Sequence, residues 1–233
     1  MARIAILMRD LEAGGIQRVM LTLAQEMATA GHALDILLLR APEHPSTPAG
    51  IRIHHLPRAR RTQVLRALAA ADPLALMAFL RRRLPTSARV LPALCAWLEQ
   101  HRPDALLAGS SWLNLGAVWA RRAGTWRGRV VLSEHNHLGA RLALDAVATP
   151  RLLALLMRRG YARADAVVAV AQAMRHDLIA RRVVAAGRVQ VIYNPVRAPA
   201  LAYAPPHPWL ADRQVPVIVS AGRLVAQKNQ RLL

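Results

Sequence analysis

Residues 3–39 read RIAILMRDLEAGGIQRVMLTLAQEMATAGHALDILLL. Two apolar runs, Arg3–Met8 and Ala33–Leu39, flank a stretch in which apolar residues recur at the spacing of one helix face. Gly31 suits the position just after a helix, where the backbone often turns left-handed. A strand, a helix and a second strand in this order indicate the repeating unit of a parallel α/β sheet.

The same alternation continues along the chain. Further strands are expected at 51–56, 105–108, 129–133, 164–170 and 189–193. Helices are expected at 62–84, with a break at Asp72-Pro73, and at 89–101, 112–123, 150–161 and 172–184. Because strands and helices alternate, we predict an α/β fold, a Rossmann-like parallel sheet with helices on both faces.

Composition divides the chain into three parts. Residues 1–197 form the predicted Rossmann-like domain, residues 198–214 a proline-rich linker, and residues 215–233 the start of a second domain. This last part is expected to hold one strand, near 215–219, and one helical turn, which is too little to bury a core. We therefore expect a truncated chain.

Composition also limits the class of protein. Of the 233 residues, 54% are hydrophobic and 19% are charged, which argues against intrinsic disorder. The single cysteine, Cys95, excludes an internal disulfide, and its apolar neighbours favour an inert thiol. The first residues do not resemble a signal peptide, and no run of 18 apolar residues is free of charge or proline. We expect a cytoplasmic protein.

The formal net charge of +19 predicts an anionic partner. Specific nucleic acid is not expected, because the arginines are scattered and only one phenylalanine is available for stacking on bases. An anionic membrane surface is the better candidate, with the protein peripheral on the inner face. Residues 62–84 mix apolar and arginine side chains as interfacial helices do, although an ordinary core-packed helix pair and an arginine-rich coding bias are equally simple explanations.

Gly14-Gly15 is the first candidate ligand loop. It follows the first strand, and open α/β sheets bind ligands at the carboxyl ends of their strands. Two glycines allow a ligand to approach the backbone closely, and a plain turn is the alternative. The dinucleotide pattern GxGxxG is missing from this loop, so no dinucleotide cofactor is expected.

Ser133-Glu134-His135-Asn136-His137 is the second candidate loop and follows the strand at 129–133. Imidazole and carboxylate groups can orient a hydroxyl group and move a proton near neutral pH. We predict that His135 is catalytic, with Glu134 and Asn136 in support. Zinc binding through the two histidines would need further ligands at suitable spacing, so no metal is expected, and a helix-capping loop is the structural alternative.

Residues 215–230, VPVIVSAGRLVAQKNQ, are the third candidate. A helix amino terminus with nearby cations favours phosphate, which indicates Gly222, Arg223 and Lys228 as phosphate-binding residues. Lys228 is the only lysine in the chain, and a compact ammonium fits a phosphate differently from a guanidinium, although an exposed lysine without a role is the alternative. Asn194, before Pro195, is expected either near the cleft or in a structural turn.

Four motifs of this chain resemble motifs of glycosyltransferase family 4, and they occur in the same order along the sequence. Residues 14–19 resemble the first loop of the family, with Gln17 in place of the usual glutamate. Residues 133–136 resemble the loop in which a histidine lies near the transferred sugar. Residues 191–196 resemble the segment that closes the first domain, and residues 220–230 resemble the donor-phosphate loop.

The resemblance implies a GT-B fold with two Rossmann-like domains, of which residues 1–197 are the acceptor side. It implies a retaining hexosyltransferase that moves a sugar from a nucleotide-sugar donor to a lipid-linked or polysaccharide acceptor in cell-envelope glycan synthesis. No metal or other cofactor is implied, because fixed cations stabilise the leaving diphosphate. The residues expected to contact the donor phosphates are Gly14, Gly15, Gly222, Arg223 and Lys228.

Two other hypotheses stay open. One is a non-catalytic basic module that docks on membranes or assembles with another chain. The other is a nucleotide-sugar epimerase of the same GT-B architecture. With half of the cleft missing, the chain alone is expected to be inactive, because positioning of the two substrates supplies much of the rate.

Overall fold

The computed structural model describes residues 1–12, 14–41, 50–143, 149–195, 216–220, 222 and 230–232. The chain forms two compact units, Met1–Pro195 and Val196–Leu233. The predicted linker at 198–214 lies outside the described residues, as do Arg223 and Lys228.

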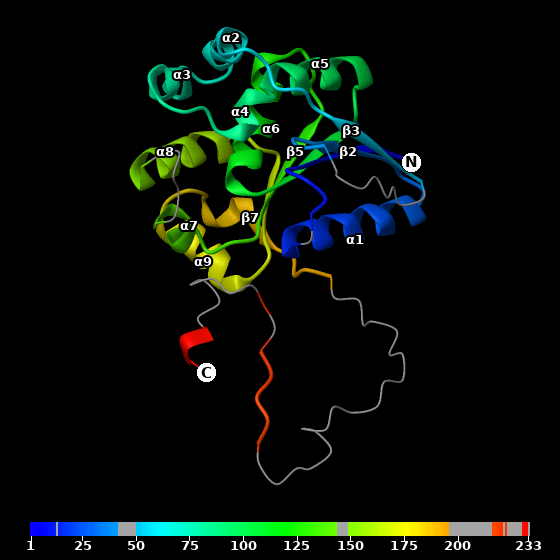
Figure 1. Cartoon of the computed structure of the whole chain (residues 1–233), viewed down its shortest axis with the longest axis vertical. Coiled ribbons are helices and arrows are strands. Elements are labelled where there is room, and N and C mark those ends of the chain that lie inside the picture. Colours follow the sequence, from blue (N-terminus) through cyan, green and yellow to red (C-terminus); the bar gives the residue numbers. More distant parts are fainter. Residues whose placement is uncertain are drawn as a thin grey trace. The chain divides into compact units, whose positions relative to one another are not determined.

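The first unit is built on a seven-stranded sheet in the order β3-β2-β1-β4-β5-β6-β7 (Figure 1). All neighbouring strands are parallel, and the order steps outward in both directions from β1, as in a Rossmann-like fold. The predicted fold class is thus confirmed. The strands are β1 (Arg3–Met8), β2 (Ala33–Leu38), β3 (Ile51–His55), β4 (Ala105–Gly109), β5 (Arg129–Glu134), β6 (Ala166–Ala169) and β7 (Val189–Val191).

Helices cover both faces of the sheet (Figure 1). On one face, α1 (Gly15–Thr29) packs the buried Met20 against β1 and β2 in a small apolar cluster that includes Ile6. On the other face, a larger cluster that includes Leu7 joins the strands to the remaining helix layer. Neighbouring residues of β1 therefore face opposite clusters, as the pleat of a strand requires. The layer contains α2 (Arg61–Ala71), α3 (Pro73–Phe79), α4 (Thr86–Arg89), α5 (Leu91–His101), α6 (Ser111–Ala123) and α8 (Pro150–Tyr161).

Local capping explains where two helices of this layer begin. The carboxylate of Asp72 accepts a hydrogen bond from the Leu74 amide at 3.1 Å, and Pro73 occupies the first turn of α3. The hydroxyl of Thr149 accepts one from the Leu152 amide at 3.3 Å at the start of α8. The predicted break at Asp72-Pro73 is therefore a helix junction.

Several helices differ from the expectation. The helical region expected at 62–84 ends at Phe79, and the short helix α4 precedes the one expected at 89–101, which begins at Leu91. The helix expected at 172–184 ends earlier, as α9 (Gln172–Ala180). Arg182 adopts a left-handed conformation with φ 55°, and Val183 turns into the core instead of continuing the helix. α7 (Leu138–Ala143), which follows the second candidate loop, is an additional helix, because its six residues are too few to show helical periodicity in the sequence.

The second unit has little regular structure among its described residues. Residues 216–220 form no strand, so the strand expected near 215–219 is wrong for the part described. An apolar run becomes a strand only when another strand hydrogen-bonds to it. Gln230–Leu232 forms a single 3-10 turn. In the described part of the chain, no helix has the length and apolar character needed to cross a membrane.

Candidate functional site

All strands of the sheet run in the same direction, so their carboxyl ends form one edge of the sheet. The loops that follow the strands leave the sheet at this edge. β1 leads through the glycine loop to α1, β4 ends at Gly109 before α6, and β5 leads through His135 to α7. The register pairs Gly109 of β4 with Ser133 of β5. The structure therefore brings the first and second candidate loops to the edge at which open α/β sheets bind ligands.

His135 is half-buried at this edge. Its Nε2 lies 3.0 Å from the hydroxyl of Ser133, and its buried Nδ1 has no hydrogen-bond partner among the described residues. Burial lowers the pKa of His135 from 6.5 to about 4, so the ring is neutral at pH 7. An unpaired buried nitrogen costs free energy, and a ligand group that hydrogen-bonded to it would remove that cost.

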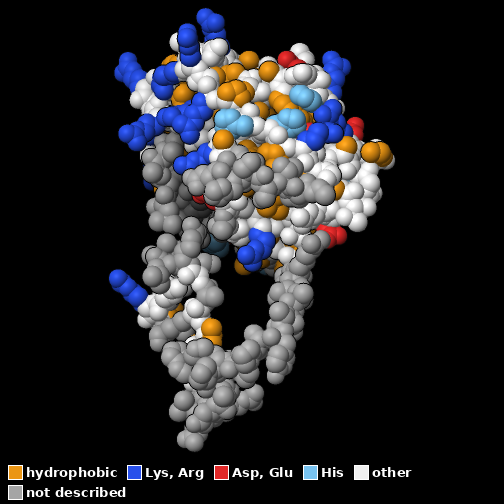
Figure 2. Space-filling model, turned by 45° about the vertical axis from the view of Figure 1, so that its right-hand side comes forward, with side chains coloured by type: hydrophobic (Ala, Val, Ile, Leu, Met, Phe, Trp, Pro, Cys, Tyr) orange, Lys and Arg blue, Asp and Glu red, His pale blue; other side chains and the backbone are white. Residues whose placement is uncertain are grey.

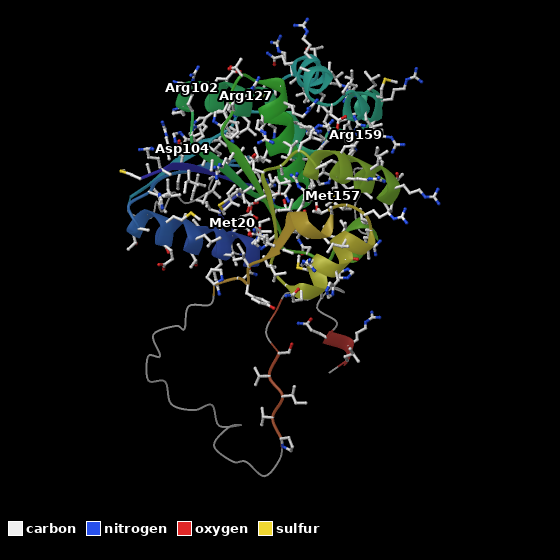
Figure 3. All side chains as sticks on the ribbon, turned by 180° about the vertical axis from the view of Figure 1, so that it is seen from behind. Met20, Arg102, Asp104, Arg127, Met157 and Arg159 are labelled. Atoms are coloured by element: carbon white, nitrogen blue, oxygen red, sulfur yellow. The ribbon has the colours of Figure 1, made fainter. Side chains whose placement is uncertain are left out.

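Gly109 and Met20 define the space around the imidazole. A Cβ at Gly109 would stand 3.3 Å from His135 Nε2 and would collide with Cε of Met20. Figure 3 labels Met20 where α1 meets the ends of the strands. Neither residue was predicted from the sequence, although a glycine at the carboxyl end of a buried strand was a usable signal for Gly109.

Glu134, next to His135, is buried against the helix layer with 2% of its surface exposed. Its Oε1 accepts hydrogen bonds from Asn114 Nδ2, at 2.9 Å, and from the Tyr161 hydroxyl. Its Oε2 accepts one from Ser111 Oγ at 3.4 Å. Glu134 thus fixes the end of β5 to α6 and α8.

Asn114 and Tyr161 complete this network. Asn114 Nδ2 also reaches the Ser133 carbonyl oxygen, at 3.1 Å, and the Tyr161 oxygen, at 2.9 Å. Burial, followed by the negative charge of Glu134, raises the pKa of Tyr161 well above its usual value. Sequence reasoning missed both residues, and the only signal was an asparagine within the apolar stretch that forms α6.

The rest of the second loop is more open. Asn136 is half-buried, and its side chain makes no hydrogen bond with another described residue. His137 is exposed, with Nδ1 3.4 Å from Oδ2 of Asp177, which also accepts a hydrogen bond from the Gly139 amide at 3.1 Å. Asp177 therefore ties α7 to α9. Among the described residues, no three His, Cys, Asp or Glu side chains are grouped so that they could hold a metal ion.

The amino terminus of α1 is free of a side-chain cap. Gly14 precedes the helix in an extended conformation, and the first turn contains no acidic residue. The Gln17 side chain donates to Oδ1 of the buried Asp10 at 2.7 Å, and Arg9 lies 2.7 Å from the other carboxylate oxygen. An amide at position 17 suits this carboxylate, whereas the glutamate usual in the resembled motif would repel it.

Four further site residues were predicted: Asn194, Gly222, Arg223 and Lys228. Asn194 is exposed after β7, and its side chain makes no hydrogen bond with another described residue. Gly222 forms an exposed bend in the second unit, and Arg223 and Lys228 lie outside the described residues. The roles assigned to these four residues stay predictions.

The sequence matches a family model described as Glycosyltransferase Family 4 over residues 13–198. No curated protein matches the sequence.

Solved structures share the fold at low sequence identity. The apo form of the lipopolysaccharide outer core galactosyltransferase WaaB has 14% identity and a TM-score of 0.57, covering 88% of this chain and 49% of that chain. Sucrose-phosphate synthase from Thermosynechococcus elongatus also has 14% identity and a TM-score of 0.57, covering 83% and 48%. UDP-GlcNAc 2-epimerase from Methanocaldococcus jannaschii has 10% identity and a TM-score of 0.51, covering 82% and 45%. The chain spans about half the length of these structures, and the likeness concerns the fold alone.

Proposed function

Because the chain belongs to glycosyltransferase family 4, we propose that it supplies the acceptor-side domain of a retaining glycosyltransferase. The enzyme transfers a hexosyl group from a nucleotide sugar to a lipid-linked or polysaccharide acceptor of the cell envelope. It works in the cytoplasm, at or near the inner face of the membrane.

The observation that carries this proposal is the neutral imidazole of His135 at the ligand-binding edge of the sheet. Transfer breaks the bond between the anomeric carbon and the diphosphate and forms a bond to the acceptor oxygen, which loses its proton. A neutral, oriented imidazole can hydrogen-bond a sugar hydroxyl in either direction, according to its tautomer. We assign His135 to the transferred sugar, with Glu134 and Asn136 supporting the loop around it.

The glycine loop favours the binding of an anion at the same carboxyl edge of the sheet. The uncapped amides at the start of α1 and the helix dipole favour a phosphate group, so we assign Gly14 and Gly15 to the donor diphosphate. In the second unit, we assign Gly222, Arg223 and Lys228 to the same diphosphate, because fixed cations stabilise the charge on a leaving group. No metal ion or further cofactor enters this assignment.

The test measures release of nucleoside diphosphate from a panel of UDP-, GDP- and ADP-sugars, with the protein expressed from its complete reading frame. His135→Ala should lower transfer by about a hundredfold or more, the scale of a lost orienting or acid–base group. His176→Ala, which removes an exposed histidine of α9, is the matched control and should leave transfer unchanged. Equal turnover in the two variants would return the loop to a structural role.

A nucleotide-sugar epimerase is the second candidate, favoured by the fold likeness to UDP-GlcNAc 2-epimerase. An epimerase changes the sugar without an acceptor, whereas a transferase consumes the donor only when an acceptor or water is available. NMR spectra of the nucleotide sugar incubated with the protein alone separate the two activities. A new sugar configuration that still carries its nucleotide would establish the epimerase.

A further inference from the structure

A cavity of about 450 Å³ lies beside the amino ends of the last strands of the sheet, whereas His135 lies at the carboxyl ends. Its walls come from the end of α8, the end of α9 and the segment that leads into β7. Arg188 directly precedes β7, and Ala162 stands four residues before β6, so the cavity lies beside the amino ends of these strands. It is therefore separate from the candidate transfer site.

Three arginines line this cavity: Arg158, Arg182 and Arg188. No carboxylate lines it in the described part of the chain. The side chains of Arg158 and Arg182 are exposed and have neither a hydrogen bond nor an ion pair with another described residue. Arg188 donates one hydrogen bond, from Nη2 to the Ala164 carbonyl oxygen at 2.5 Å. Cations gathered without a counter-charge favour an anion between them.

The backbone fixes one of these cations in place. Arg182 has φ 55°, in the left-handed region that costs free energy for a residue with a side chain. The amide of Arg182 donates to the Ile179 carbonyl oxygen at 2.8 Å, and the amide of Val183 donates to that of Leu178 at 2.9 Å. This turn ends α9 and directs the chain so that residue 182 lines the cavity.

The remaining wall of the cavity is mainly apolar. Ile179, Val183 and Val184 contribute to it, and a bare inorganic anion gains nothing from such a surface. An anion attached to an apolar body gains from both parts of the wall. This combination identifies an anionic amphiphile as the ligand class.

The neighbouring surface extends the same combination of side chains. Leu155, 44% exposed, lies one helical turn before Arg158 on α8. On α3, Met77 is 67% exposed, and Leu80, just after that helix, is 44% exposed. α3 adjoins α8 through the ion pair of Asp72 with Arg159, at 3.5 Å, and Figure 3 labels Arg159 on α8.

The chain as a whole is strongly basic, with a formal net charge of +19. On the face drawn in Figure 2, the side chains of Lys and Arg outnumber those of Asp and Glu. Exposed apolar side chains among arginines are the pattern of a surface that lies in the headgroup layer of an anionic membrane.

We propose that the cavity of Arg158, Arg182 and Arg188 binds the headgroup phosphate of an anionic phospholipid. The guanidinium groups surround the phosphodiester, and the glycerol and the start of the acyl chains lie on the apolar wall. Leu155, one helical turn from Arg158, enters the outer layer of the membrane beside it. This interaction is independent of sugar transfer, so either proposal can fail without the other.

The test is co-sedimentation with vesicles of phosphatidylcholine, with and without phosphatidylglycerol. The cavity variant is R158Q/R182N, since asparagine tolerates the left-handed backbone at position 182. Each basic residue at an anionic surface contributes a factor of about five, so binding to the anionic vesicles should fall about thirtyfold. The control is R58Q/R102N, which removes two exposed arginines elsewhere, one of them also left-handed with φ 43°, and should change binding by about twofold or less.

A second measurement separates the headgroup from general attraction to a charged surface. Soluble dihexanoyl phosphatidylglycerol should raise the melting temperature of the wild type and the control but not of the cavity variant. Circular dichroism checks that both variants are folded. Equal vesicle binding by the two variants would overturn the proposal. So would equal binding to vesicles without phosphatidylglycerol, or a cavity-dependent response to inorganic phosphate or RNA but not to the lipid.

Discussion

Two buried carboxylates of the first unit differ in their described hydrogen-bond donors, which are mainly arginines for Asp35 on β2 and neutral side chains for Glu134 at the end of β5. Asp35 is fully buried. Its oxygens lie 2.8 Å from Arg52 Nε, 2.8 Å from His54 Nε2 and 3.0 Å from Arg3 Nε. Burial alone would raise the pKa of Asp35, but the hydrogen bonds from Arg52, His54 and Arg3 outweigh burial and hold it well below its usual range. The ionised side chain ties β1, β2 and β3 together.

The described hydrogen bonds to Glu134 include three from groups of another kind. Asn114, Tyr161 and Ser111 donate these three, and each of them has a neutral side chain. We therefore expect the position of Asp35 to depend strongly on charge, and that of Glu134 to depend more on the hydrogen bonds from these neutral donors. The first carboxylate stabilises one side of the sheet, and the second fixes the loop that carries His135.

The largest expected effect comes from removal of the charge on Asp35. Asp35→Asn leaves Arg3 and Arg52 without their counter-ion and should lower the free energy of unfolding by about 3 kcal/mol. Asp165→Asn is the surface control, because the Asp165 side chain is 44% exposed and pairs with Arg121. Its cost should be about 1 kcal/mol. Urea unfolding measures both, and equal costs would remove the distinction between the two environments.

The second prediction concerns acid stability. Asp35 has a lowered pKa in the folded state, so its contribution is present above about pH 4 and is lost as the pH falls below that value. The pKa of His135 is lowered from 6.5 to about 4, so the folded state resists its protonation, and stability falls between those two pH values. Between these two pH values the free energy of unfolding should fall by about 2 kcal/mol less in His135→Gln than in the wild type.

Unfolding measured at half-unit steps from about pH 7.5 to about pH 3 separates the two groups. Asp35→Asn should flatten the curve only below about pH 4. The same slope between pH 6.5 and about 4 in the wild type and in His135→Gln would mean that the imidazole is not desolvated.

The third prediction applies the same type of change to the other carboxylate. Glu134→Gln keeps the shape and the acceptor oxygen that Asn114 and Tyr161 use, so it should cost about 1 kcal/mol or less. Glu134→Leu, which removes the acceptors and leaves these two donors buried, should cost more, about 2 kcal/mol. A cost for Glu134→Gln as large as that for Asp35→Asn would show that charge, not geometry, holds Glu134.

The sequence predicted the sheet better than the site. Buried parallel strands are continuous apolar runs, so β1 and β5 could be located to within a residue. Asn114 and Tyr161 meet Glu134 across 20 and 27 residues of chain, and such contacts leave no local pattern. The edge that carries the candidate site could be predicted from topology alone, since the loops that follow parallel strands all lie at the carboxyl ends of those strands. The lowered pKa of His135 could not be predicted, because it arises from burial that only the folded chain creates.

A third carboxylate, Asp10, combines the two modes, with Arg9 on one oxygen and the amide of Gln17 on the other. Gln17→Glu replaces the amide donor by a second carboxylate, and Arg9 offsets only part of the repulsion. The variant should lose about 0.5 kcal/mol of stability at pH 7. Near pH 4 the introduced carboxyl group takes up a proton and can donate a hydrogen bond to Asp10, so the difference from the wild type should vanish. Thermal unfolding at both pH values measures this difference in stability, and Gln25→Glu on the same helix is the control. A loss that persists at the lower pH would show that the amide acts through its shape, in which case Asp10 belongs with Glu134 and not with Asp35.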